Sequence, residues 1–282
     1  MSSTNNQLDK EGQHSRLMVE AGGDNALTVT KNSGTKTLIY LISGIISAVL
    51  LLLVLLWACF FGASTSDENH FVISCSNLST GIHDIQIDEI SSITARCNND
   101  IAGGNWMVIL NRFDGSENFT RNWNEFRMGF GNLNGEFFIG LDHLHRITKS
   151  QPVELYVTFK YFDGINGAVR YDNFKIGDDK KSYTLESLGR FSGTGSDDLM
   201  TEYNLNQKFT TYDQDNDEDV KNCAEAYKGA WWFKSCKGPN PLALYSKNER
   251  SSELSSMSWN GWTPIKTIQM LIRPKPQQLN HI

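Results

Sequence analysis

The strongest hydrophobic pattern in the chain is one uninterrupted apolar segment near its start. Residues 38–61 form a run of 24 positions without a charged side chain. A helix of that length rises about 36 Å, which is enough to cross the roughly 30 Å hydrocarbon core of a bilayer. The apolar region of a secretory signal peptide is shorter, about 7–15 residues. The pattern therefore predicts one transmembrane helix over residues 37–62.

Charged residues beside the apolar segment predict its orientation. Lys31 and Lys36 precede it. Asp67 and Glu68 follow it. Because positively charged flanks are retained in the cytosol, we expect the N-terminus inside the cell and the C-terminus outside. The chain is thus predicted to be a single-pass type II protein of the plasma membrane, with residues 1–36 as a disordered cytosolic tail.

Past the membrane segment, short apolar runs alternate with turns. A short helix rich in aromatic residues is predicted at Asn122–Gly129, and regular structure is expected to thin out from Gly189 onward. Gly-rich and Asp-Gly turns bound four predicted strands, at Trp106–Leu110, Phe137–Leu141, Val153–Lys160 and Ala168–Ile176.

The rest of the chain is expected to hold one extracellular domain, because no long linker or internal repeat divides it. We place a connector at residues 63–74, the domain at residues 75–274 and a C-terminal tail at residues 275–282. The connector has no heptad repeat, so no coiled-coil stalk is expected. Homo-oligomerisation would then have to come from the membrane helix or from the domain itself.

Composition and charge narrow the classes of function. The chain has 26 Lys and Arg against 32 Asp and Glu, a formal net charge of -6. Nucleic-acid binding needs a basic face, so we expect no nucleic-acid partner. His143 and His145 resemble a metal pair but are better explained as structural. None of the common hydrolase, phosphate-binding or dinucleotide-binding motifs is present, and we expect no enzymatic activity.

The cysteines fit an oxidising compartment. Cys59 lies inside the apolar segment, which leaves an even number beyond it. Two disulfides are therefore predicted among Cys75, Cys97, Cys223 and Cys236. Three pairings are open, and proximity in sequence favours Cys75 with Cys97 and Cys223 with Cys236.

Two glycosylation sequons support an extracellular location. Asn77 is followed by Leu-Ser and Asn118 by Phe-Thr. Both lie on the side of the apolar segment predicted to be outside the cell. We expect both asparagines to carry N-linked glycans.

An acidic segment at residues 212–223, YDQDNDEDVKNC, is the clearest candidate for chemistry. Its alternating carboxylates are Asp213, Asp215, Asp217 and Asp219. Such a density of hard oxygen ligands suits Ca²⁺, which takes 6–8 oxygens. An EF-hand is excluded because Glu218 replaces the glycine of the sharp turn and Ala224 replaces the final glutamate. The alternative is an acidic loop that binds no ion.

Three blocks of sequence resemble the fibrinogen C-terminal domain family, which includes ficolins, tachylectins and the C-terminal domains of tenascins and angiopoietins. They are Gly103–Thr148, Lys208–Trp232, and the pair Trp259–Trp262 and Met270–Pro274. The resemblance implies an α+β fold with a central antiparallel sheet and a loop-rich calcium-binding subdomain. It also supports the disulfide pairing that proximity favours.

The same resemblance implies a calcium site. Side-chain oxygens of Asp215 and Asp217 and backbone carbonyls of Asp219 and Lys221 would hold the ion. Asp213 would then lie beside the site or face solvent.

In family members that bind acetylated sugars, an aromatic pocket with a Cys-His peptide lies beside the calcium loop. The matching positions imply a ligand-binding set of Tyr227, Trp232, Phe233, Cys236 and Lys237. Lys237 stands where the histidine is expected, and the Tyr-Ala pair of the pocket is replaced around Glu253. An acetyl group needs an aromatic socket and a hydrogen-bond donor, so these departures put acetyl-sugar binding in doubt.

Two classes of function follow. The first is a recognition protein that binds carbohydrate or another pattern ligand through a calcium-supported pocket, in innate immunity or self/non-self recognition. The alternative is a cell-surface protein ligand or adhesion molecule, including cell–cell or gamete recognition, without lectin activity. Angiopoietin-type and fibrinogen-type members bind polypeptides beside the same loop, and membrane anchoring fits both classes.

Overall fold

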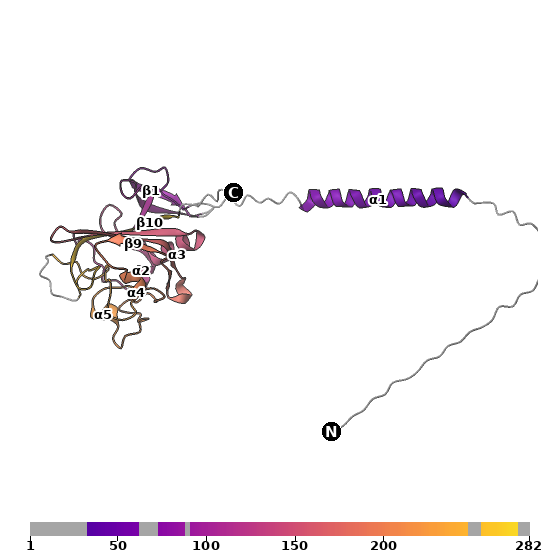
Figure 1. The fold of residues 1–282 in the computed structure, drawn as a ribbon. Helices are drawn as coiled ribbons and strands as arrows, with labels where there is room; N and C mark the ends of the chain where they lie inside the picture. The colour runs from indigo at the N-terminus through magenta and orange to yellow at the C-terminus, as the bar shows by residue number, and fades with distance from the viewer. Residues whose placement is uncertain (1–32, 62–72, 88–90, 248–254, 276–282) are drawn as a thin grey trace, which may run out of the picture. The chain divides into compact units, whose positions relative to one another are not determined.

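The computed structural model describes residues 33–61, 73–87, 91–247 and 255–275 (Figure 1). The chain divides into two compact units, residues 1–68 and 69–282. Most of the predicted cytosolic tail, connector and C-terminal tail lie outside the described residues, and so does Glu253.

The first unit contains one long helix, α1 (Ser33–Phe61), of 29 residues. Its segment Leu38–Trp57 has a mean hydropathy of 2.9, and by length and composition it could cross a membrane. The prediction of one apolar helix is thus confirmed. That this helix spans a membrane, and with which orientation, stays a prediction.

The second unit is built on an antiparallel sheet with the strand order β1-β2-β3-β10-β6-β7-β8, to which β5 adds on β3, β4 on β5, and β9 on β7. The strands are β1 (Gly81–Gln86), β2 (Ser92–Asn98), β3 (Trp106–Arg112), β4 (Phe130–Gly131), β5 (Phe137–Phe138), β6 (Val153–Tyr161), β7 (Asn166–Ile176), β8 (Leu185–Ser187), β9 (Phe191–Thr194) and β10 (Ile265–Pro274). Each pairing between them is antiparallel, as predicted.

The last strand of the domain occupies the centre of the sheet. β10 pairs with β3 on one side and with β6 on the other. Four of its apolar residues are buried, and they lie on both faces of the sheet: Ile268, Met270, Leu271 and Ile272. The expectation that regular structure thins out after Gly189 is therefore wrong for this segment, because the chain returns to complete the sheet.

Helices lie to one side of the sheet strands β9 and β10 in Figure 1. They are α2 (Trp123–Met128), α3 (Leu141–Ser150), the 3-10 turn η1 (Asp179–Lys181), α4 (Leu199–Tyr203) and α5 (Cys223–Ala226). The predicted aromatic helix is confirmed as α2, which begins with a capping box between Asn122 and Glu125. His145 lies on α3 with its Nδ1 atom 3.1 Å from the Ile176 carbonyl, a structural contact.

The strand predicted at Phe137–Leu141 is shorter than expected. β5 ends at Phe138, and Leu141 already begins α3. Gly140 between them has φ of 101°, and a Cβ there would lie 2.7 Å from the Met128 backbone. A glycine at this close approach turns the chain from the sheet into the helix.

Residues 206–247 and 255–264 form a loop-rich region with few regular elements. Isolated bridges, such as Thr210 with Trp231, replace continuous strand pairing. A disulfide between Cys223 and Cys236 closes this region, and a second one joins Cys75 to Cys97. Both predicted pairings are confirmed. This region is stabilised by a disulfide and buried aromatic rings, whereas the sheet is stabilised by hydrogen bonds between paired strands.

Candidate functional site

The alternating aspartates of the acidic loop fold the backbone around themselves. Oδ1 of Asp215 accepts the backbone N–H of Asp217 at 3.3 Å. Oδ1 of Asp217 accepts that of Asp219 at 3.0 Å, and Oδ1 of Asp219 accepts that of Lys221 at 3.3 Å. Each side chain thus bonds the residue two positions on, a turn that Asp favours. The spacing of two in the sequence produces three successive turns.

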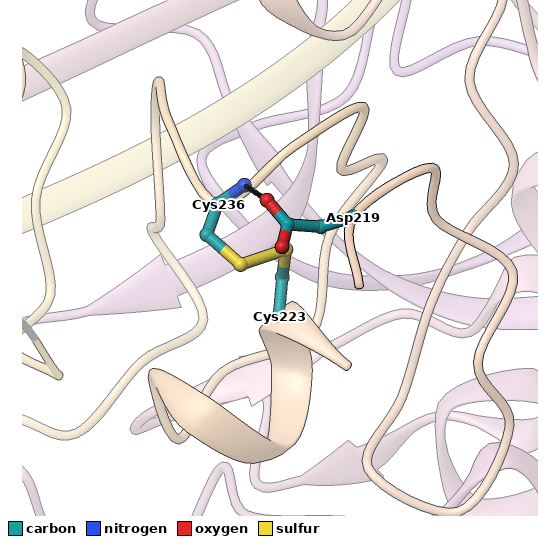
Figure 2. A group of neighbouring side chains, drawn as sticks. All are labelled: Asp219, Cys223 and Cys236. Carbon is teal, nitrogen blue, oxygen red and sulfur yellow. Dashed lines mark hydrogen bonds between the residues drawn. A yellow bond between two sulfur atoms is a disulfide. The ribbon is translucent and has the colours of Figure 1, made fainter. Parts of the chain in front are cut away.

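The loop is tied to the disulfide by the second oxygen of two aspartates. Oδ2 of Asp217 accepts the backbone N–H of Cys223 at 2.9 Å. Oδ2 of Asp219 accepts that of Cys236 at 3.5 Å, as Figure 2 shows. The disulfide therefore positions the loop as well as closing it.

Among the described residues, Asp219, Cys223 and Cys236 are the only three metal-type side chains whose ligand atoms lie within 4.8 Å of one another. The two sulfurs form a disulfide in Figure 2, so neither is a thiolate that could bind a metal. We interpret this group as a structural anchor for the loop.

The charge of the loop is only partly compensated. Burial raises the pKa of the Asp217 carboxyl, and the neighbouring charge of Asp215 raises it further, although two backbone N–H groups oppose the shift. Asp213 has other partners: its Oδ1 accepts the backbone N–H of Trp123 at 2.9 Å and the Thr211 hydroxyl at 2.8 Å. Asp213 therefore fastens the loop to α2, which the sequence did not indicate.

The donors present in the loop fit a hard cation. Asp215 and Asp217 supply two interacting carboxylates. In the part of the chain that the structure describes, the backbone carbonyls of Asp219 and Lys221 accept no hydrogen bond. Calcium prefers carboxylate and carbonyl oxygens, with water to complete its shell. These four residues are the set that the resemblance implied.

Two of the predicted ligand-binding residues lie in the core instead of at a pocket. Trp232 is 1% exposed, and its indole N–H donates to the Tyr183 carbonyl at 2.7 Å. Its ring packs edge-on against Phe209, with centroids 5.3 Å apart. Phe233 is also buried. Their side chains are occupied in holding the loop-rich region to the sheet, so in this conformation they offer no surface to a ligand.

Tyr227 is half-buried, and another aromatic ring lies against it. Trp262 stacks on Tyr227 with ring centroids 5.1 Å apart and an interplanar angle of 27°. Trp262 itself remains 41% exposed. The aromatic surface available at this point therefore comes from Trp262 and not only from Tyr227.

Lys237 lies at a cavity of about 270 Å³ that Tyr227 does not line. The cavity is lined by Leu199, Tyr203, Lys237, Gly238, Asn260, Gly261 and Trp262. Cys236, the neighbour of Lys237, is half-buried in its disulfide. The predicted ligand-binding residues therefore do not form one pocket. Trp232 and Phe233 lie in the core, Trp262 covers Tyr227, and Lys237 lines a cavity that Tyr227 does not line.

Sequence reasoning missed two walls of this cavity. Trp262 belongs to a quoted motif, but its stacking on Tyr227 could not be inferred from that motif. Tyr203 ends α4, more than thirty residues before Lys237, and no local pattern connects the two.

Both sequon asparagines are exposed. Asn77 has φ of 62°, in a turn. The Asn118 side chain accepts the backbone N–H of Thr120 at 3.0 Å. Their exposure is compatible with glycan attachment, which stays a prediction.

Comparison with known proteins agrees with this architecture. Chicken tenascin-R is 37% identical over 199 residues, which cover 69% of this chain and 14% of that protein. Mouse tenascin is 36% identical over 198 residues, 69% of this chain and 9% of its own length. The chain therefore spans only about a tenth of the length of these relatives, and the match is one of a domain.

Solved structures give the same result. The fibrinogen-like globe domain of human ANGPTL2 superposes with a TM-score of 0.67 at 30% identity, covering 71% of this chain and 95% of that one. A lamprey fibrin D-dimer has a TM-score of 0.65 at 22% identity, over 89% of this chain and 91% of that one, and shows the fold alone. The family model of the fibrinogen beta and gamma chains, C-terminal globular domain, matches residues 65–275. The chain belongs to this fibrinogen C-terminal domain family.

Proposed function

We propose that the chain is a cell-surface recognition protein whose fibrinogen-type domain binds an extracellular protein, in adhesion or cell–cell recognition, without catalysis. The observation that carries this proposal is the stacking of Trp262 on Tyr227. It covers the tyrosine that an acetylated sugar would need and leaves an exposed indole beside Lys237. The relatives with tenascin and angiopoietin-like domains support the same class.

The surface around the acidic loop exposes an apolar and an aromatic side chain. Val220, directly after the last aspartate of the loop, is fully exposed, and Tyr212 is 44% exposed. Exposed Trp and Tyr are enriched where proteins bind one another, because they bury a large area at a low cost in side-chain entropy. A pocket for acetylated sugar would instead have used Trp232 and Phe233, and both are buried. We therefore prefer the protein ligand over the lectin.

Calcium is proposed to hold this surface in shape. Asp215 and Asp217 would bind the ion through their carboxylates, and Asp219 and Lys221 through their backbone carbonyls. The ion would supply the positive charge that the loop lacks, which favours the ordered conformation of its backbone. The loop aspartates also bond the backbone of both disulfide cysteines, so ordering the loop would fix the segment that leads to Lys237.

Anchoring by α1 is part of the proposal. With the N-terminus in the cytosol, both disulfides and both sequons would be in an oxidising compartment, which suits them. The domain begins and ends at one place, since Ile73 and Gln151 exchange hydrogen bonds and the Lys275 N–H donates to the Pro152 carbonyl.

The test uses the full chain displayed on cells. Adhesion to cells of the source tissue is measured with calcium or with a chelator, after treating the target cells with protease or with glycosidases, and with free N-acetylglucosamine as competitor. We expect calcium-dependent adhesion that protease abolishes and the sugar leaves unchanged. Adhesion that the sugar competes away and that resists protease would replace the proposal with a lectin. The orientation is tested by treating intact cells with a glycosidase. A decrease in the apparent mass of the chain would show that its glycans lie outside the cell.

A further inference from the structure

An asparagine is followed directly by a glycine at Asn134-Gly135, Asn166-Gly167 and Asn260-Gly261. A glycine has no Cβ to shield its own backbone nitrogen, so this nitrogen can attack the side-chain amide of the asparagine before it. We propose that Asn260 is a modification site that deamidates spontaneously in the folded protein, to aspartate and isoaspartate, and that the fold protects the other two asparagines. The reaction itself does not depend on the proposed function.

The reaction needs only the chain and water. The backbone nitrogen of Gly261 gives up its proton and forms a bond to Cγ of Asn260. The bond from Cγ to the side-chain nitrogen breaks, and that nitrogen leaves as ammonia with the proton. The product is a five-membered succinimide ring. Water then opens the ring at one of its two carbonyl carbons, which gives aspartate or isoaspartate without oxidation or reduction.

The first argument is the position of Asn260 in an open loop. An antiparallel bridge between Ser258 and Pro264 closes this loop. Asn260 is exposed, and a Cβ placed on Gly261 would have no neighbour within 4 Å. The Asn260 side chain does interact with Tyr161: burial raises the pKa of that hydroxyl, and the hydrogen bond from Asn260 opposes the shift. This contact does not involve Gly261, so the peptide that must react has room to move.

The second argument is the free nitrogen of Gly261. In the part of the chain that the structure describes, the N–H of Gly261 donates no hydrogen bond. The N–H of Gly135, in contrast, donates to the Asn132 carbonyl at 2.8 Å. That bond must break before the nitrogen can turn towards the Asn134 amide, and breaking it costs free energy. The same dipeptide is therefore less reactive at Asn134 than at Asn260.

The third argument is the protection of Asn166 by the sheet. Gly167 lies in β7 and pairs with Phe159 of β6. Gly167 is buried, and a Cβ there would lie 2.2 Å from the Phe159 ring. The nitrogen of Gly167 could reach the amide only if the strand pair opened, which is a rare event inside a sheet. The three asparagines should therefore react in the order Asn260, Asn134, Asn166.

The modification would change the surface to which we assign recognition. It adds a carboxylate, and isoaspartate adds one carbon atom to the main chain between Trp259 and Trp262. Trp259 is buried and stacks on Phe159, with ring centroids 5.8 Å apart. Trp262 is 41% exposed, so the added length is taken up there and shifts its ring on Tyr227. The expected effect on adhesion rests on the proposed function.

The experiment follows the full chain, in lipid nanodiscs, over time in water labelled with heavy oxygen at pH 7. Peptide mapping by mass spectrometry measures the labelled carboxyl oxygen gained at each asparagine. We expect Asn260 to react first and Asn134 about fivefold more slowly, the factor that the net worth of one hydrogen bond gives. Asn166 should stay unchanged. In urea, where the chain is unfolded, the three sites should react at similar rates.

Two variants assign the signal. Asn260→Gln keeps an amide but would require a six-membered ring, so it should remove the reaction at this position. Asn134→Gln is the matched control and should leave the rate at Asn260 unchanged. Both asparagines are exposed, and thermal unfolding of the two variants verifies that they are folded.

Equal rates at Asn260 and Asn134 in the folded chain would overturn the inference, and so would a faster reaction at Asn134 or Asn166. A folded chain that does not react at Asn260, although the unfolded chain does, would overturn it as well. Adhesion is then compared between fresh and aged protein. We expect it to fall as Asn260 reacts and to persist in aged Asn260→Gln. Unchanged adhesion of the modified chain would remove the effect on Trp262 and leave the modification site, whereas no adhesion by the fresh chain would contradict the proposed function instead.

Discussion

Two carboxylates of the domain, one on the sheet and one in the acidic loop, have opposite electrostatic environments. Asp172 on β7 accepts the backbone N–H of Arg190 at 2.8 Å, and this bond lowers the pKa of its carboxyl. The charges of Arg190 and Lys275 lower it further. For Asp217, burial and the charge of Asp215 raise the pKa instead. The charge of Asp172 is thus compensated by neighbouring groups of the domain, whereas the charge of the loop is compensated only in part.

This difference indicates which of the two regions would be stabilised by a bound ligand. Glu136, on the sheet side, is 2% exposed and accepts four backbone N–H groups, from residues 113, 114, 115 and 117. No such set surrounds the loop aspartates, which bond mainly to the loop itself. We infer that the sheet is stable without ligands, that the loop-rich region depends on its disulfide and its buried aromatic rings, and that the proposed calcium ion would stabilise it further.

The largest expected effect comes from the aromatic contact that joins the two regions. Trp232→Ala removes a ring buried between Phe174 of β7 and Phe209 of the loop-rich region. We expect a loss of about 4 kcal/mol in the free energy of unfolding, because the change leaves a large cavity. Trp262→Ala is the matched control and should cost under about 1 kcal/mol, since that ring is partly exposed. Urea unfolding of both variants measures the difference, and equal losses would contradict the assignment of Trp232 to the core.

The two disulfides offer a more selective comparison. The chain-entropy model gives about 3 kcal/mol for each, because the closed loops have separations of 22 and 13 residues. Replacing Cys75 and Cys97 by serine should reduce stability and leave the response to calcium intact. Replacing Cys223 and Cys236 should reduce stability by a similar amount and abolish that response. Calcium titration followed by thermal unfolding distinguishes the two, and an unchanged response in the second pair would detach the disulfide from the loop.

Calcium itself should stabilise one region of the domain. A ligand at 100 times its dissociation constant adds about 2.7 kcal/mol to the free energy of unfolding. We expect Asp217→Asn to lose this gain. Asp213→Asn should keep it, although it weakens the contact of the loop with α2. A calcium response that survives in Asp217→Asn would contradict the proposed ligand set.

On the sheet side, Glu136→Gln should cost about 2 kcal/mol, within the range for hydrogen bonds to a charged group. The amide cannot accept all four N–H groups, because its nitrogen is a donor. Glu117→Gln is the control, since Glu117 makes a partly exposed ion pair with Arg121, worth under about 1 kcal/mol. The effect should be the same with and without calcium, and any dependence on calcium would mean that the two regions are coupled.

The sheet was largely predictable because its strands carry local signals. β3, β6 and β7 are apolar runs bounded by turns, and their buried faces need no distant information. The place of β10 was not predictable in this way, because it depends on pairing with β3, some 160 residues earlier. The end of β5 was misplaced because a close approach of Gly140 to Met128 decides it.

The acidic loop was predictable for the same reason, since each of its turns forms between aspartates that are two positions apart in the sequence. The pocket was not. Trp232 and Phe233 match aromatic positions by sequence, but burial between strands and loop removes them from the surface. The contact of Trp262 with Tyr227 joins residues 35 positions apart, and only the folded chain brings them together.

The smallest expected effect concerns pH and isolates the charge compensation of the sheet. Because the folded pKa of Asp172 is lowered, its charged form stabilises the fold above the unfolded pKa of about 3.9. That contribution should be lost as the pH falls below about 4 through the folded pKa. Asp172→Asn should therefore lower the free energy of unfolding at pH 6 by under about 1 kcal/mol and by less near pH 2. Urea unfolding at the two pH values measures this, and an equal loss at both would mean that Asp172 acts through packing and not through its charge.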